Sequence, residues 1–187
     1  MFERFTKDAR AVVKGAVGQA EGTGARHVGA EHLLLSVLDR EGSRASFALT
    51  ALGLDGRRES VRAALGEARR RAGLTQAETD ALAGLGIDVP AIVARVEEAH
   101  GAGALSAGRG DGVRRSGHRP FDREAKDVLV GALRAATARR DRRIGDEHVL
   151  LALTARPGVP AEVLADHGVT YASVTRVLYG NDGAAAG

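Results

Sequence analysis

Apolar residues recur at helical spacing in two long stretches of the chain, residues 4–20 and 120–136. Positions three and four apart lie on one face of a helix, so this spacing predicts an amphipathic helix in each stretch. The apolar positions are Phe5, Ala9, Val12, Val13, Ala16, Val17 and Ala20 in the first stretch, and Phe121, Ala125, Val128, Leu129, Ala132, Leu133 and Ala136 in the second. No segment shows the sustained alternation that predicts a strand. We therefore predict an all-α fold.

The two stretches are copies of one pattern, related by an offset of 116 residues. The same offset carries "GAEHLLLSVL" (29–38) onto "GDEHVLLALT" (145–154). The sequences at 45–55 and 59–65 then match those at 161–170 and 172–178, with small length differences. Each copy predicts about four short helices. Copies of a unit that cannot bury its apolar face alone stack on each other, so we expect two packed repeats.

Capping residues mark further helix starts. Thr6 and Asp122 are expected to cap the first helix of each repeat, Thr75 and Glu78 have the spacing of a capping box, and Asp88 opens another helix. The expected organisation is a first repeat at 1–65, a helical insert at 66–100, a flexible Gly- and Arg-rich tether at 101–117, a second repeat at 118–180 and a disordered tail at 181–187.

Composition narrows the class of protein. Hydrophobic residues make up 44% of the chain but aromatic residues only 3%, so the core must be built from Ala, Leu and Val. The chain has no Cys, which excludes disulfides and thiol catalysis and fits a reducing cytoplasm. Neither an export signal nor a membrane-spanning run is visible. We therefore expect a cytoplasmic protein, with no metal and no cofactor.

The basic charge is a weak indication of a nucleic-acid partner. The formal net charge is +3, and of the 27 basic residues only Lys7, Lys14 and Lys126 are lysine. Arginine runs occur at 69–71 ("RRR") and 139–143 ("RRDRR"), but no aromatic residues interleave them. A basic regulator that binds nucleic acid is therefore the third alternative.

Four motifs together resemble the duplicated N-terminal domain of Clp ATPases, above all the ClpC type. They are "MFERFTKDARAVV" at the start, "GAEHLLLSVL", "GHRPFDREAKDVLVGALRAA" (117–136) and "GDEHVLLALT". The resemblance implies two pseudo-symmetric four-helix repeats that bind substrates and adaptors for a chaperone-protease. The chain departs from the family because roughly forty extra residues separate its repeats. It also lacks a GxxxxGK[ST] motif, so we expect a free-standing receptor domain that does not hydrolyse ATP.

The recurring Glu-His pair has two interpretations. From the residues alone, Glu31 and Glu147 lie in the first turn of a helix, where the helix dipole favours a carboxylate, and each following histidine is a satisfied buried group. The family resemblance implies instead that these glutamates bind phosphoarginine, a degradation mark, through its guanidinium. The family has threonine before the glutamate. Here Ala30 removes a hydroxyl, while Asp146 supplies a cap and places a negative charge where a phosphate would lie.

A second surface is implied by the resemblance alone. In related domains, cyclic-peptide antibiotics bind a groove whose residue types are kept here at Phe2, Val13, His118, Phe121 and Lys126. The alternative is that Phe121, like Phe5, is simply a core residue of its repeat.

These observations predict a non-enzymatic protein- or peptide-binding module of the Clp system. Its expected partners are Clp chaperone-protease components, their adaptors or tagged substrates. The main alternative is a decoy that sequesters Clp-directed cyclic peptides. A receptor would depend on Glu31 or Glu147, whereas a decoy would depend on Phe2 and Phe121.

Overall fold

The computed structural model describes residues 2–105 and 119–180. The predicted tail at 181–187, most of the predicted tether, His118 and the side chain of Phe2 lie outside this description. The first repeat and insert contain η1 (Phe2–Arg4), α1 (Lys7–Gly22), α2 (Ala30–Leu38), α3 (Arg44–Ala51), η2 (Asp55–Arg57), α4 (Arg58–Arg70), α5 (Gln76–Gly84) and α6 (Val89–His100). The second repeat contains α7 (Arg123–Ala138), α8 (Asp146–Ala155), α9 (Val159–Asp166) and α10 (Tyr171–Tyr179). The described residues form helices and no strand, so the all-α prediction is confirmed.

The predicted caps start the helices where the sequence places them. The Thr6 hydroxyl accepts the Ala9 amide at 3.1 Å, and the Asp122 carboxylate accepts the Ala125 amide at 2.8 Å. In the insert, Thr75 and Glu78 form a reciprocal capping box, and Asp88 caps α6. These side chains satisfy first-turn amides that have no partner within the helix. The last helix of the first repeat, α4, continues past the expected boundary at residue 65 and ends at Arg70.

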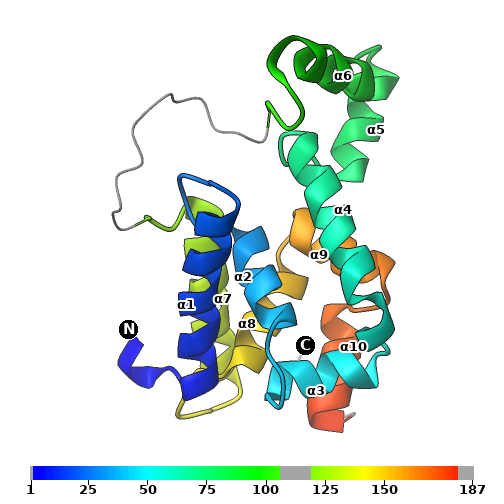
Figure 1. Ribbon diagram of the computed structural model, residues 1–187. Coiled ribbons are helices and arrows are strands. Elements are labelled where there is room, and N and C mark those ends of the chain that lie inside the picture. Colours follow the sequence, from blue (N-terminus) through cyan, green and yellow to red (C-terminus); the bar gives the residue numbers. More distant parts are fainter. Residues whose placement is uncertain (1, 106–118, 181–187) are drawn as a thin grey trace.

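The repeats are interleaved. Helices α2 and α8 lie in the middle of the two repeats, and α1 and α7 lie on one side of them, with α1 packed on α2 and α7 packed on α8 (Figure 1). The outer helices pack across repeats, because α4 of the first repeat packs on α9 of the second, and α10 of the second packs on α3 of the first. Each cross-repeat contact therefore has its counterpart when the two repeats are exchanged.

Four backbone hydrogen bonds follow the same exchange. The amide of Thr6 donates to the carbonyl of Ile144, and the amide of Ile144 donates to the carbonyl of Arg4. An offset of 116 turns these bonds into Asp122 to Val28 and Val28 to Pro120, and both are present at 2.9 to 3.0 Å. The segment ahead of the long helix in each repeat is thus paired with the segment ahead of the central helix in the other, as a two-fold relation requires.

The core has the predicted composition. Among the described residues, every buried apolar side chain is Ala, Val or Leu except Phe5, Ile144 and Pro160. Small side chains let helices approach closely, which suits short helices crossing in layers. In the part of the chain that is described, no helix is long and apolar enough to cross a membrane.

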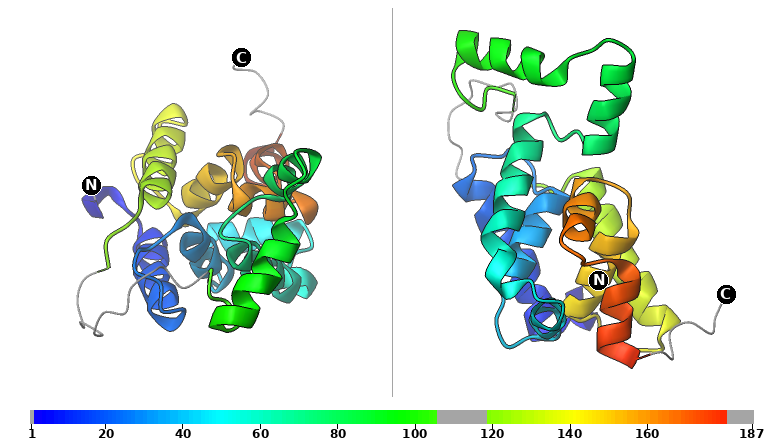
Figure 2. Two further views of the ribbon diagram at one scale, coloured as in Figure 1. Left: turned by 90° about the horizontal axis from the view of Figure 1, so that it is seen from above. Right: turned by 90° about the vertical axis from the view of Figure 1, so that its right-hand side faces the viewer.

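The insert extends from the upper end of the repeats in Figure 1, and Figure 2 shows it as an arm above them. Its first helix, α5, is anchored to the second repeat. The Glu162 carboxylate on α9 accepts the amide of Gln76 at 2.6 Å and that of Ala77 at 3.4 Å. A carboxylate at a helix N-terminus satisfies free amides and complements the dipole.

Candidate functional sites at two helix starts

The recurring histidines hold the starts of α2 and α8. His32 and His148 are each 1% exposed, and the Nδ1 atom of each accepts the amide of the N-cap glycine, Gly29 or Gly145, at 2.9 Å. Because Nδ1 accepts an N–H, the proton of a neutral ring lies on Nε2. His32 Nε2 lies 3.2 Å from the Thr23 hydroxyl. The expectation of a satisfied buried histidine is therefore confirmed.

Burial favours the neutral form of His32. The pKa of His32 is lowered from 6.5 to about 4, mainly by desolvation and in part by the charges of Arg69 and Arg119, while Asp122 acts in the opposite direction. A neutral ring is the form that can accept the Gly29 amide.

The two glutamates lie beside the N-cap glycines. A Cβ atom at Gly29 or Gly145 would collide with the carboxylate of Glu31 or Glu147, so glycine makes room for each carboxylate over the helix start. Burial raises the pKa of both glutamates, and the backbone N–H of each glutamate opposes the rise. The helix-dipole expectation therefore describes part of this setting, but desolvation outweighs it.

The N-cap of α8 is Gly145 rather than Asp146, so the prediction that Asp146 caps this helix is wrong. Asp146 is 2% exposed, and its carboxylate accepts the Ala45 amide in the first turn of α3 at 3.3 Å. In the other repeat the residues at these two places are Ala30 and Pro160. Proline has no amide hydrogen to donate and alanine has no side-chain acceptor, so the hydrogen bond between Ala45 and Asp146 has no counterpart at these two positions.

Glu31 lies in a pocket of about 480 Å³. Its side chain is 32% exposed. The insert contributes Thr75, Glu78 and Leu105 to the wall, and α4 contributes Leu65 and Arg69. The remaining walls come from Glu124 on α7 and the segment 157–160 ahead of and within α9. This pocket combines carboxylates with apolar surface.

Glu147 lies at the corresponding helix start of the second repeat, where Arg44 contacts its carboxylate. Its side chain is 6% exposed, and Arg44 Nη1 lies 3.0 Å from its carboxylate Oε1. The pocket here measures about 340 Å³, and Arg142 and Arg143 of the second arginine run line it. The Arg44 guanidinium also lies 5.5 Å from the ring centre of Tyr179.

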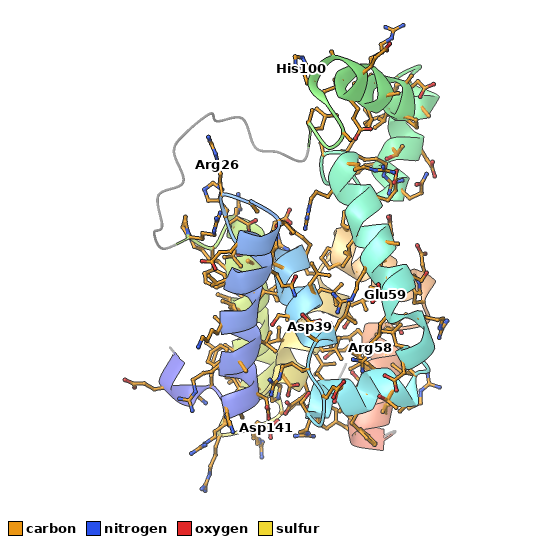
Figure 3. All side chains as sticks on the ribbon, viewed as in Figure 1. Arg26, Asp39, Arg58, Glu59, His100 and Asp141 are labelled. Atoms are coloured by element: carbon orange, nitrogen blue, oxygen red, sulfur yellow. The ribbon has the colours of Figure 1, made fainter. Side chains whose placement is uncertain are left out.

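The two pockets are equivalent in the repeat. Arg44 is the first residue of α3 and lines the Glu147 pocket; Val159 is the first residue of α9 and lines the Glu31 pocket. Asp8 and Glu124 likewise are the second residues of α1 and α7, and each lines the pocket of the glutamate in the other repeat. The two pockets are therefore built from equivalent elements. The first residue of the outer helix is an arginine at the Glu147 pocket and a valine at the Glu31 pocket. Figure 3 shows Asp141, which lines the Glu147 pocket, at the end of the molecule opposite to His100 of the insert.

The described residues of the predicted antibiotic groove, Val13, Phe121 and Lys126, do not line either pocket. Val13 is buried in the core, Phe121 is half-buried against it and is bridged to Val28, and Lys126 is exposed on α7. His118 and the side chain of Phe2 lie outside the described residues. The groove stays a prediction. The expectation that Phe5 is a core residue is confirmed, since it is 1% exposed.

The arginine runs contact the protein itself. Arg70 bonds to Glu67, Arg71 bonds to Gln76, and Arg139 stacks 3.2 Å from the ring centre of Tyr179. These contacts leave the nucleic-acid alternative without support beyond the charge pattern. Within the described residues, no group of three or more His, Cys, Asp or Glu side chains is placed to hold a metal ion.

Sequence reasoning missed Arg44, Val159 and the N-cap glycines. Gly29 and Gly145 left a signal, because they recur at the same offset immediately ahead of the glutamates. Arg44 left none, since its partner Glu147 is 103 residues away.

The fold is an all-α double repeat with an open acidic pocket at one helix start, which places the molecule in the class of helical repeat modules. Residues 120–183 match the family of the Clp repeat (R) N-terminal domain. The second repeat therefore matches the Clp repeat N-terminal family that the sequence motifs predicted. Its assignment to the ClpC type stays a prediction.

Two solved structures share the fold. One comes from preliminary structural investigations of a malarial protein secretion system, with a TM-score of 0.60 and 12% identity over 94% of this chain and 92% of that one. The other is the N-terminal domain of the caseinolytic protease associated chaperone ClpD from Arabidopsis thaliana. It has a TM-score of 0.51 and 18% identity over 95% of this chain and 94% of that one.

Proposed function

We propose that this protein is a non-enzymatic protein- and peptide-binding module of the Clp proteolysis system, and that Glu31 is the centre of its binding site. The observation that carries the proposal is the open pocket at the start of α2. A partly exposed carboxylate faces it, and the walls combine apolar side chains with the charged groups of Arg69, Glu78 and Glu124. Pockets with apolar walls and a few fixed polar groups are the usual form of a ligand site.

The chemistry of the pocket suits an arginine-type side chain. A carboxylate binds a planar guanidinium through two parallel hydrogen bonds, and the apolar walls can cover the methylene stem. Phosphoarginine, the ligand implied by the family resemblance, contains the same guanidinium group. Glu147 is a weaker candidate because Arg44 already contacts it.

The test uses an unfolded protein as the probe. Labelled α-lactalbumin, reduced and carboxymethylated so that it stays unfolded, is titrated with the full chain and binding is followed by fluorescence anisotropy. We expect saturable binding that weakens at least fivefold in Glu31→Gln and is unchanged in Glu59→Gln, which alters an exposed glutamate on α4. Absence of binding to the wild-type chain would contradict the proposal.

A further inference from the structure

We infer that the Glu31 pocket binds an unphosphorylated arginine side chain of a partner protein, in the way that Arg44 occupies the Glu147 pocket of the same chain. This inference rests on the proposed function and specifies its ligand.

The first support is the equivalence of the two pockets. Each is formed by a glutamate at the start of a central helix, the first turn of the long helix from the other repeat, and the start of a short outer helix. In the Glu147 pocket the outer helix supplies Arg44, whose guanidinium lies 3.0 Å from the carboxylate. In the Glu31 pocket the same position is Val159, which cannot supply a charge. At one of the two equivalent sites a glutamate thus already binds a guanidinium, which is the group that we infer for the other site.

The second support is the space left at Glu31. The pocket of about 480 Å³ exceeds the volume of a single arginine side chain, so a residue and part of its neighbours can enter. Leu65 of α4, Leu105 of the insert and Pro157 line it. These apolar surfaces match the three methylene groups of an arginine, whose head can then reach the carboxylate.

The third support is the charge of the walls. Glu31, Glu78 and Glu124 face the pocket with one guanidinium, that of Arg69. The carboxylate of Glu78 is fixed by the amide and hydroxyl of Thr75 at 2.8 and 2.9 Å. An excess of negative charge favours a cation and repels a phosphate group, and the alanine at position 30 offers no hydroxyl to hold one. The insert supplies Glu78, so it contributes directly to this selection.

The experiment compares three labelled peptides that differ at one position, which is arginine, phosphoarginine or citrulline. Citrulline has the shape of arginine without its charge. In fluorescence anisotropy titrations with the full chain, we expect the arginine peptide to bind at least tenfold more tightly than the citrulline peptide and severalfold more tightly than the phosphoarginine peptide.

Three variants locate the site. Glu31→Gln should weaken binding of the arginine peptide at least tenfold. Glu59→Gln, which alters an exposed glutamate on α4 away from both pockets, is the control and should leave that affinity unchanged. Val159→Arg should also abolish binding, since it places an arginine at the start of α9 as Arg44 stands at the start of α3. Circular dichroism and thermal unfolding check that each variant is folded, and Val159→Arg keeps Glu31 intact if Glu31→Gln is unstable.

Tighter Glu31-dependent binding of the phosphoarginine peptide would overturn the inference and leave the proposed function standing. Equal binding of the arginine and citrulline peptides, or equal losses of affinity in Glu31→Gln and Glu59→Gln, would also overturn it. If the unfolded protein probe itself does not bind, the proposed function fails independently of the ligand's charge.

Discussion

At the scale of single residues, the repeated Glu-His pair divides into two roles. The histidine accepts the N-cap amide from the third helical position, a place where glutamate or glutamine usually closes a capping box. The glutamate one position earlier is left over the helix start. At Glu147 it meets an arginine of its own chain, and at Glu31 it faces an open pocket. The histidine therefore builds the helix start, and the glutamate is available for binding.

The His32 hydrogen bond makes stability depend on pH. The pKa of His32 falls from 6.5 in an unfolded chain to about 4 in the fold, so the folded state favours the neutral ring. The stabilisation from the neutral ring is complete above pH 6.5 and has been lost once the pH has fallen through about 4. The free energy of unfolding changes by about 3 kcal/mol over this interval.

We expect His32→Gln, whose amide oxygen can accept the Gly29 amide without titrating, to show a smaller loss of stability between pH 7 and pH 4. Urea unfolding at several pH values measures the difference. The raised pKa of Glu31 acts with the opposite sign, stabilising the fold on acidification, but it is present in both proteins. Parallel pH profiles for the wild-type chain and the variant would contradict the assignment.

At the scale of elements, the backbone amides at the starts of α3 and α9 correspond to the hydrogen-bond acceptors that α8 and α2 offer. Asp146 accepts the Ala45 amide at the start of α3. At the corresponding position of α9 the residue is Pro160, which has no amide hydrogen, and the residue that corresponds to Asp146 in the first repeat is Ala30. Both departures from the family's threonine thus have a packing reason. An acceptor is present where a donor needs it, and is missing where there is no donor.

This matching can be tested by a double-mutant cycle. Ala30→Asp places a carboxylate at a site that is 3% exposed, and the corresponding position of α9 is a proline that has no amide hydrogen to donate, so we expect it to lower the free energy of unfolding by about 2 kcal/mol. Pro160→Ala restores an amide hydrogen, and the double variant should recover part of this loss. Urea unfolding of the four proteins gives the coupling energy. Additive effects of the two substitutions would show that the positions do not communicate.

At the scale of the whole molecule, the sequence predicted what depends on local signals. The caps at Thr6, Asp122, Thr75 and Asp88 are in place because a cap needs only residues two or three positions away. The duplication also predicted the helix order. The pairing of Arg44 with Glu147 could not be foreseen, because it depends on how helices from different repeats cross. The mistaken cap at Asp146 has the same cause, since its actual partner lies in the other repeat.

The arrangement of the insert depends on Glu162, which joins α9 to the start of α5. Glu162→Ala removes the acceptor of two backbone amides, so we expect faster hydrogen exchange at Gln76 and Ala77. We also expect severalfold weaker binding at the Glu31 pocket, because Thr75 and Glu78 form part of its wall. Hydrogen-exchange mass spectrometry measures the first effect. Glu98→Ala, on the exposed surface of α6, is the control and should change neither. Unchanged exchange at α5 in Glu162→Ala would refute this anchor.

The crossed backbone bonds between Thr6 and Ile144 and between Asp122 and Val28 also bear on how such a molecule could arise. One repeat alone contains both partners of this pairing but cannot bring them together within itself, so it could complete the bonds only with a second copy. When two such copies are fused, the contact between two chains becomes a contact within one chain, and forming it closes a loop. The entropy cost of closing that loop grows only with the logarithm of its length. The junction between the repeats is therefore where evolution could add a pair of helices at low cost, and there the added helices gained a share in the pocket.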